Sequence, residues 1–153
     1  MHADGKINWD DLNSEVSYDR QESYRQSKLA NILFAFELSR KFDAAGADAK
    51  SVAVHPGLVN SNRANKNFTG LMRSLMNLMS RLSYQSTEMG ALSLLYAAVS
   101  PEVKPGGYYG PEGDTKGYPV EVQAGDAAYD EAEAKRLWAV SEMKTGVTYE
   151  MIN

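Results

Sequence analysis

Apolar residues recur at helical spacing along several stretches of this chain, and the longest stretch runs from about residue 22 to residue 42. Its apolar side chains fall on two stripes, formed by Leu29, Ile32, Leu33 and Phe36 on one side and by Phe34 and Leu38 on another. A helix that is apolar on two sides needs two partners. One partner is expected to be a sheet.

Shorter patterns predict the other elements. Residues 1–20 are polar and turn-rich, which predicts an irregular surface segment, and the turn at residues 44–48 ends the long helix. Residues 51–54 form a short β-type run that Pro56 terminates, because proline fixes φ and lacks a backbone donor. Residues 86–99 predict another helix, capped by Ser86 or Thr87, in which Gly90 indicates close packing against a neighbouring backbone.

The last helix is expected to begin near Asp130, where an Asp-x-x-Glu pattern resembles a capping box, and to end at Gly146. Leu137 and Trp138 would supply its buried side, and Glu131 and Lys135 are i,i+4 partners.

Residues 106–113 are rich in glycine and could be mistaken for a phosphate-binding loop. No helix opens directly after them, and Pro111 and Pro119 interrupt this part of the chain. A late strand containing Tyr108 and Tyr109, with a loop after it, is therefore the preferred prediction.

Composition narrows the class of protein. The chain is 43% hydrophobic and 24% charged, with a formal net charge of −4 and a pI near 5.2, so nothing suggests a nucleic-acid partner. It has neither an apolar stretch of about 18 residues nor a signal-peptide pattern. With no cysteine, disulfides and cysteine metal sites are excluded, and no metal site is predicted. We expect a cytoplasmic protein, with contact at the periphery of a membrane left open.

Tyr24 and Lys28 are the strongest candidates for chemistry. Positions i and i+4 share a helix face, so Lys28 can lie beneath the Tyr24 hydroxyl. A nearby ammonium favours the phenolate form of a tyrosine, which makes Tyr24 a candidate general acid/base.

Two further segments place this pair in context. Residues 51–61 read Ser-Val-Ala-Val-His-Pro-Gly-Leu-Val-Asn-Ser, and residues 7–15 read Ile-Asn-Trp-Asp-Asp-Leu-Asn-Ser-Glu. Together with Tyr-x-x-x-Lys, they resemble the C-terminal half of a short-chain dehydrogenase/reductase, in its retinol-dehydrogenase-like branch. The resemblance covers nearly the whole chain.

This resemblance implies a role for each matching residue. Tyr24 would be the catalytic acid/base, and Lys28 would assist it and hold the nicotinamide ribose. Pro56 and Gly57 match the turn beside the nicotinamide ring, and Val59 matches the residue whose backbone meets the carboxamide. Ser61 stands where the family usually has threonine. His55 is interpreted as a packing residue.

Features of the family's first half are not found in the sequence. They are the glycine-rich turn for the pyrophosphate and the catalytic serine, for which Ser14, Ser17, Ser23 and Ser27 are too close to Tyr24 or on the wrong element. A complete doubly wound domain also usually needs more than 153 residues. We therefore expect residues 1–153 to form a single partial domain, the C-terminal part of a Rossmann-type doubly wound parallel α/β sheet without its N-terminal nucleotide-binding half.

Two functions are expected as alternatives. In the first, the parent fold transfers hydride between NAD or NADP and an apolar alcohol, aldehyde or ketone, retinol- or steroid-like, and the chain alone has little or no turnover. A missing oxyanion donor costs about 2.7–4 kcal/mol in comparable sites. In the second, the chain is a catalytically dead remnant that acts by association. A homodimer through the helix at residues 22–42 is one way to cover its second face, and the absent half of the domain is the other.

A basic segment adds a further question about partners. Residues 51–87 contain no Asp or Glu but hold Arg63, Lys66, Arg73 and Arg81, and leucines and methionines recur at helical spacing within them. Residues 63–82 could form a substrate lid, pack into the core, or make weak contact with a membrane surface. The resemblance favours the lid.

Overall fold

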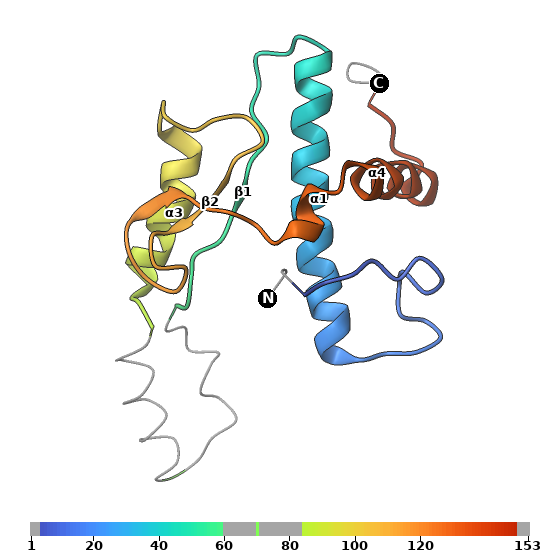
Figure 1. Cartoon of the computed structure of the whole chain (residues 1–153), viewed down its shortest axis with the longest axis horizontal. Coiled ribbons are helices and arrows are strands. Elements are labelled where there is room, and N and C mark those ends of the chain that lie inside the picture. Colours follow the sequence, from blue (N-terminus) through green and yellow to red (C-terminus); the bar gives the residue numbers. More distant parts are fainter. Residues whose placement is uncertain (1–3, 60–69, 71–83, 150–153) are drawn as a thin grey trace. The chain divides into compact units, whose positions relative to one another are not determined.

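A computed structural model describes residues 4–59, residue 70 and residues 84–149 (Figure 1). In chain order its elements are α1 (Arg20–Ala44), β1 (Ala53–Val54), α3 (Thr87–Val99), β2 (Tyr108–Pro111), β3 (Pro119–Glu121), the short 3₁₀ helix η1 (Asp126–Tyr129) and α4 (Glu131–Thr145). Two compact units make up the chain. The first comprises Met1–Ala53, Lys104–Gly107 and Gln123–Asn153, and the second comprises Val54–Val103 and Tyr108–Val122.

Helix α1 is the longest element of the first unit. The Asp19 carboxylate caps its start by accepting hydrogen bonds from the backbone N–H groups of Gln21 and Glu22, both at 2.8 Å. The helix ends at Ala45, and Gly46 comes next in the left-handed conformation. The predicted helix and its terminating turn are thus confirmed, with α1 two residues longer at each end than expected.

The first apolar stripe of α1 forms the core of this unit. Its members are all buried: Leu29, Ile32, Leu33 and Phe36. Helix α4 lies beside α1 in Figure 1 and buries Leu137 and Trp138, as predicted.

The second stripe of α1 has a partner within the chain itself. The Trp138 ring of α4 stacks on Phe34 with the centroids 5.1 Å apart and the planes 13° from parallel. On the first stripe, the Tyr129 ring of η1 packs on Phe36 with the centroids 5.5 Å apart. Phe34 remains 40% exposed, so α4 covers this side of α1 only in part. The sequence pattern did not predict this cover from α4.

Helix α4 is capped by Asp130 and ends at Gly146, as the sequence predicts. The Asp130 carboxylate accepts a hydrogen bond from the Glu133 backbone N–H at 3.0 Å, and Gly146 closes the helix with φ +68°. An ion pair at 3.5 Å joins Glu131 and Lys135. The Glu133 carboxylate accepts from the indole N–H of Trp9 at 3.0 Å, so the irregular N-terminal segment is attached to α4.

The second unit is built on a hairpin. Strands β2 and β3 pair antiparallel, with Tyr109 opposite Glu121 and Pro111 opposite Pro119. The sheet order is β1-β2-β3. The His55 backbone N–H donates to the Tyr109 carbonyl at 2.9 Å and that of Ala53 to the Gly107 carbonyl at 3.0 Å. From the Ala53 bond to the His55 bond, the donor and the acceptor both move two residues toward the C-terminus, which shows that β1 and β2 are parallel.

The fold is therefore α/β with a mixed three-stranded sheet, and it corresponds to part of a Rossmann-type domain. Tyr108 and Tyr109 are buried strand residues, which confirms that the glycine-rich segment is a strand and not a phosphate loop. Strand β3 was not predicted. Pro119 argued against it, but as the first residue of the strand it is tolerated there.

Helix α3 packs against this hairpin. The Ser86 hydroxyl caps it by accepting from the Met89 backbone N–H at 3.2 Å. A Cβ at Gly90 would collide with the Val59 side chain and lie 3.5 Å from Pro56, so the close packing predicted at Gly90 is confirmed. Glycine here lets α3 approach the Pro56-Gly57 turn.

Candidate functional site

Helix α1 brings Tyr24 and Lys28 onto one face. The Lys28 ammonium nitrogen lies 5.3 Å from the centroid of the Tyr24 ring, as expected for residues one turn apart. Tyr24 is 48% exposed, so its phenol is open to a ligand. The sequence prediction that these two residues lie together is confirmed.

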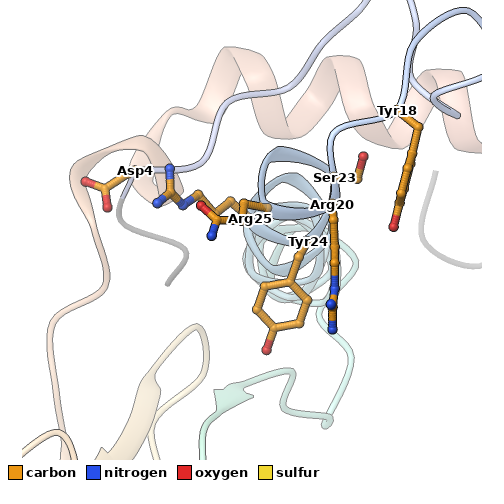
Figure 2. Close-up of a pocket in the computed structure, with 7 residues that line it drawn as sticks. Asp4, Tyr18, Arg20, Ser23, Tyr24 and Arg25 are labelled. Carbon is orange, nitrogen blue, oxygen red and sulfur yellow. The ribbon is translucent and has the colours of Figure 1, made fainter. Parts of the chain in front are cut away.

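An open pocket of about 770 Å³ surrounds the start of α1 (Figure 2). Its lining consists of Asp4, Tyr18, Arg20, Gln21, Ser23, Tyr24 and Arg25. In Figure 2 the side chains of Arg20 and Tyr24 extend from the same side of the helix. The surroundings of Tyr24 in the first unit are thus polar and contain two guanidinium groups.

The serines near Tyr24 make local contacts. The hydroxyl groups of Ser14 and Ser23 are 3.0 Å apart, and Ser14 has a positive φ of 54°. The Ser27 hydroxyl donates to the Tyr24 carbonyl at 2.8 Å. That none of them replaces the family's catalytic serine stays a prediction.

The Pro56-Gly57 turn belongs to the second unit, and its shape requires glycine. Gly57 has φ +69°, in the region where side chains are strained. A Cβ there would also lie 2.5 Å from the Thr115 carbonyl oxygen and 2.7 Å from Pro111. The same Thr115 oxygen accepts from the Leu58 N–H at 2.7 Å, so the turn is fastened to the loop after β2.

His55 supports the turn from its other side. Its Nδ1 accepts a hydrogen bond from the Gly57 N–H at 3.3 Å, and its ring stacks on Tyr108 with centroids 5.1 Å apart. The ring also lies so close to Gly110 that a Cβ there would overlap it. Burial lowers the pKa of His55 below its usual 6.5, although the carboxylate of Asp114 acts in the opposite direction. His55 is the packing residue that was predicted, with an additional hydrogen bond to the turn.

Val59 presents a peptide edge that the sheet does not use. It forms an isolated parallel bridge with Gln85, in which the Gln85 N–H donates to the Leu58 carbonyl at 2.8 Å. In this arrangement the bond goes to the residue before Val59, so the N–H and C=O of Val59 itself point away from Gln85. Neither group has a partner within the part of the chain that the structure describes. Val59 therefore offers one donor and one acceptor side by side.

Gln85 is a site residue that sequence reasoning missed. It is 7% exposed, and its side-chain amide donates to the Pro56 carbonyl at 2.6 Å. A glutamine just before a helix cap carries no recognisable pattern, so only the tertiary structure identifies it.

The predicted residues therefore fall into two groups. Tyr24 and Lys28 belong to the first unit, whereas Pro56, Gly57 and Val59 belong to the second. Ser61 and nearly all of the basic segment at residues 63–82 lie outside the described residues.

Other kinds of site find little support in residues 4–59 and 84–149. No cluster of three or more His, Asp or Glu side chains that could hold a metal ion occurs there. None of the helices described is both long enough and apolar enough to cross a lipid bilayer.

Comparison with known proteins gives a consistent set of relatives. The chain is 39% identical to retinol dehydrogenase 14 of Homo sapiens over 150 residues, which is 96% of this chain and 42% of that protein. It is 34% identical to polyprenol dehydrogenase of Homo sapiens, over 95% of this chain and 42% of that protein. It is also 33% identical to dehydrogenase/reductase SDR family member 13 of Homo sapiens, over 95% of this chain and 37% of that protein.

A solved structure agrees with these relatives. The crystal structure of an uncharacterized protein from Mycobacterium Paratuberculosis matches with a TM-score of 0.73 and 33% identity, over 97% of this chain and 48% of that one. No protein-family model matches the chain. The chain thus spans less than half the length of the relatives it matches.

Proposed function

The chain belongs to the short-chain dehydrogenase/reductase family over the length that it shares with its relatives, and on this basis we propose that it is part of an oxidoreductase. The proposed reaction moves a hydride between NAD or NADP and an apolar alcohol, aldehyde or ketone. Two of the relatives are named for retinol and polyprenol, which are both apolar alcohols. This supports the substrate class and leaves the individual substrate open.

The observation that carries the proposal is the pairing of Tyr24 and Lys28 on one exposed face of α1. In the oxidation direction, the Tyr24 oxygen takes the proton of the substrate hydroxyl; in reduction, it returns that proton. The Lys28 ammonium nitrogen lies beside this ring, 5.3 Å from its centroid. A bound nicotinamide cofactor supplies or accepts the hydride.

The residues present fit such a cofactor. The unused N–H and C=O of Val59 match a primary amide, which carries both a donor and an acceptor, as the nicotinamide carboxamide does. Lys28 would hold the ribose, and the Pro56-Gly57 turn would lie beside the ring. By the family resemblance, Ser61 would also contribute a hydroxyl group to cofactor binding.

The test compares Tyr24→Phe with Tyr18→Phe, because Tyr18 lines the same pocket and is more exposed. Purified chain at high concentration is incubated with each reduced cofactor and an apolar aldehyde or ketone, and product is measured alongside the thermal shift that the cofactor causes. We expect a cofactor-dependent thermal shift and only a very low rate of product formation in the native chain. That rate should fall to background in Tyr24→Phe and stay unchanged in Tyr18→Phe. A rate that survives Tyr24→Phe would contradict the proposed role of Tyr24.

The second candidate function is association through α1 without catalysis. Its support is Phe34, which remains 40% exposed on the side of α1 that α4 covers in part. A chain that shows neither a cofactor-dependent thermal shift nor product, and that forms a dimer which Phe34→Glu disrupts, would favour this candidate.

A further inference from the structure

The side chain of Gln85 forms hydrogen bonds with the Pro56-Gly57 turn and with the loop between β2 and β3. Its side-chain N–H donates to the Pro56 carbonyl at 2.6 Å, and its side-chain oxygen accepts from the Gly117 N–H at 3.1 Å. Its backbone N–H donates to the Leu58 carbonyl at 2.8 Å. One buried residue thus makes three hydrogen bonds, two of them to the segment that carries Val59.

These bonds require the chemistry of an amide. The side chain of Gln85 donates on one side and accepts on the other, and this assignment of its oxygen and nitrogen is based on the two partners. A glutamate there would keep the acceptor for Gly117 but would place a carboxylate oxygen against the Pro56 carbonyl. A leucine would remove the side-chain partners of both the Pro56 carbonyl and the Gly117 N–H.

The bonds to Pro56 and Leu58 also determine which way Val59 faces. Because the Leu58 carbonyl is turned toward Gln85, the alternation of a β-type backbone turns the N–H and C=O of Val59 to the opposite side. The Leu58 N–H is already held by the Thr115 carbonyl. A substitution of Gln85 keeps the backbone donor to the Leu58 carbonyl but removes the side-chain donor to the Pro56 carbonyl, which helps to fix this orientation.

We propose that Gln85 is a positioning residue that holds residues 56–59 so that the N–H and C=O of Val59 face a primary amide of a bound ligand. The inference rests on the proposed function, in which that amide is the carboxamide of NAD or NADP. Gln85 itself does not contact the ligand.

The first measurement is hydrogen exchange on the chain without ligand. Gln85→Glu removes the donor to Pro56, and Gln26→Glu is the matched control, since the Gln26 amide likewise donates to a loop carbonyl, that of Leu12, at 2.9 Å. We expect the Leu58 amide to exchange at least about tenfold faster in Gln85→Glu and at the native rate in Gln26→Glu. An unchanged exchange rate of Leu58 in Gln85→Glu would overturn the proposal.

The second measurement is ligand discrimination, which a purely structural role would not alter. The native chain should bind a nicotinamide dinucleotide more tightly than the analogue in which an acetyl group replaces the carboxamide, because the analogue lacks the amide donor. In Gln85→Glu, the ratio of the dissociation constant of the analogue to that of the dinucleotide should fall toward one. An equal loss of affinity for both ligands in Gln85→Glu would overturn the proposal. If the native chain binds neither ligand, that result contradicts the proposed cofactor function instead. The hydrogen-exchange measurement would then still test the role of Gln85.

Discussion

At the scale of single residues, His55 illustrates how a half-buried ring can hold a backbone turn. Its Nδ1 accepts from the Gly57 N–H, so the neutral ring must carry its proton on Nε2. A protonated ring would have no acceptor left for Gly57. Its stacking on Tyr108 and its close approach to Gly110 fix the ring in this position.

This arrangement predicts a pH dependence of stability. Burial lowers the pKa of His55 in the folded chain below the 6.5 of the unfolded chain, so the unfolded state binds more protons between these two values. The stability contributed by His55 is therefore complete above about pH 6.5 and is lost as the pH falls through the folded pKa. The charge of Asp114 opposes the shift without reversing it.

The measurement is urea unfolding between pH 7.5 and 5.5 in the native chain and in His55→Gln. We expect the free energy of unfolding to fall more with decreasing pH in the native chain than in the variant. Carboxylates with lowered pKa values, such as Asp11 and Glu88, start from reference values of 3.8 and 4.5 and so titrate mainly below this range. Equal slopes in the two proteins would show that His55 is not the group responsible.

Only some of these residue-scale features could be predicted from the sequence. Tyr24 and Lys28 were predicted to lie together because both are on one helix and the helical repeat determines their spacing. The bonds of Gln85 to Pro56 and Gly117 could not be predicted, since they join residues 29 and 32 positions apart. No local pattern encodes such contacts.

At the scale of elements, helix ends agreed with the sequence more closely than strand pairing did. Asp19, Ser86 and Asp130 each cap a helix through the side-chain oxygen, a contact within three residues along the chain. Strand β3 and the stacking of Trp138 on Phe34 were missed, because both depend on partners that are distant in sequence. Local chemistry determines where a helix begins, and long-range packing determines what covers it.

The cap of α4 gives a prediction at this scale. Asp130→Ala removes the acceptor for the Glu133 N–H and should lower the free energy of unfolding by about 1 kcal/mol. Asp130→Asn keeps a side-chain oxygen and should cost much less. Urea unfolding of both variants at neutral pH measures the difference. If Asn and Ala are equally destabilising, the charge of Asp130 matters more than its hydrogen bond.

At the scale of the whole molecule, the proposed catalytic and cofactor groups are shared between two compact units. Tyr24 and Lys28 are in one unit and the Pro56-Gly57 turn is in the other. Hydride transfer would need both groups to be held in a fixed relation to one substrate. The product assay on the native chain and Tyr24→Phe therefore tests whether the two groups act on one substrate.

The basic segment at residues 63–82 gives the last prediction, which concerns how the molecule meets a membrane. Arg63, Lys66, Arg73 and Arg81 could attract anionic lipid, but the chain as a whole carries a net charge of −4, which opposes such contact. If the segment is a substrate lid, its leucines and methionines face the protein and are not free to enter a bilayer. We therefore expect the chain not to float with vesicles of phosphatidylcholine, with or without phosphatidylserine. The opposite result would be flotation with the anionic vesicles. If salt weakened this flotation and the double variant Met72→Glu, Met76→Glu abolished it, the segment would be established as a membrane contact.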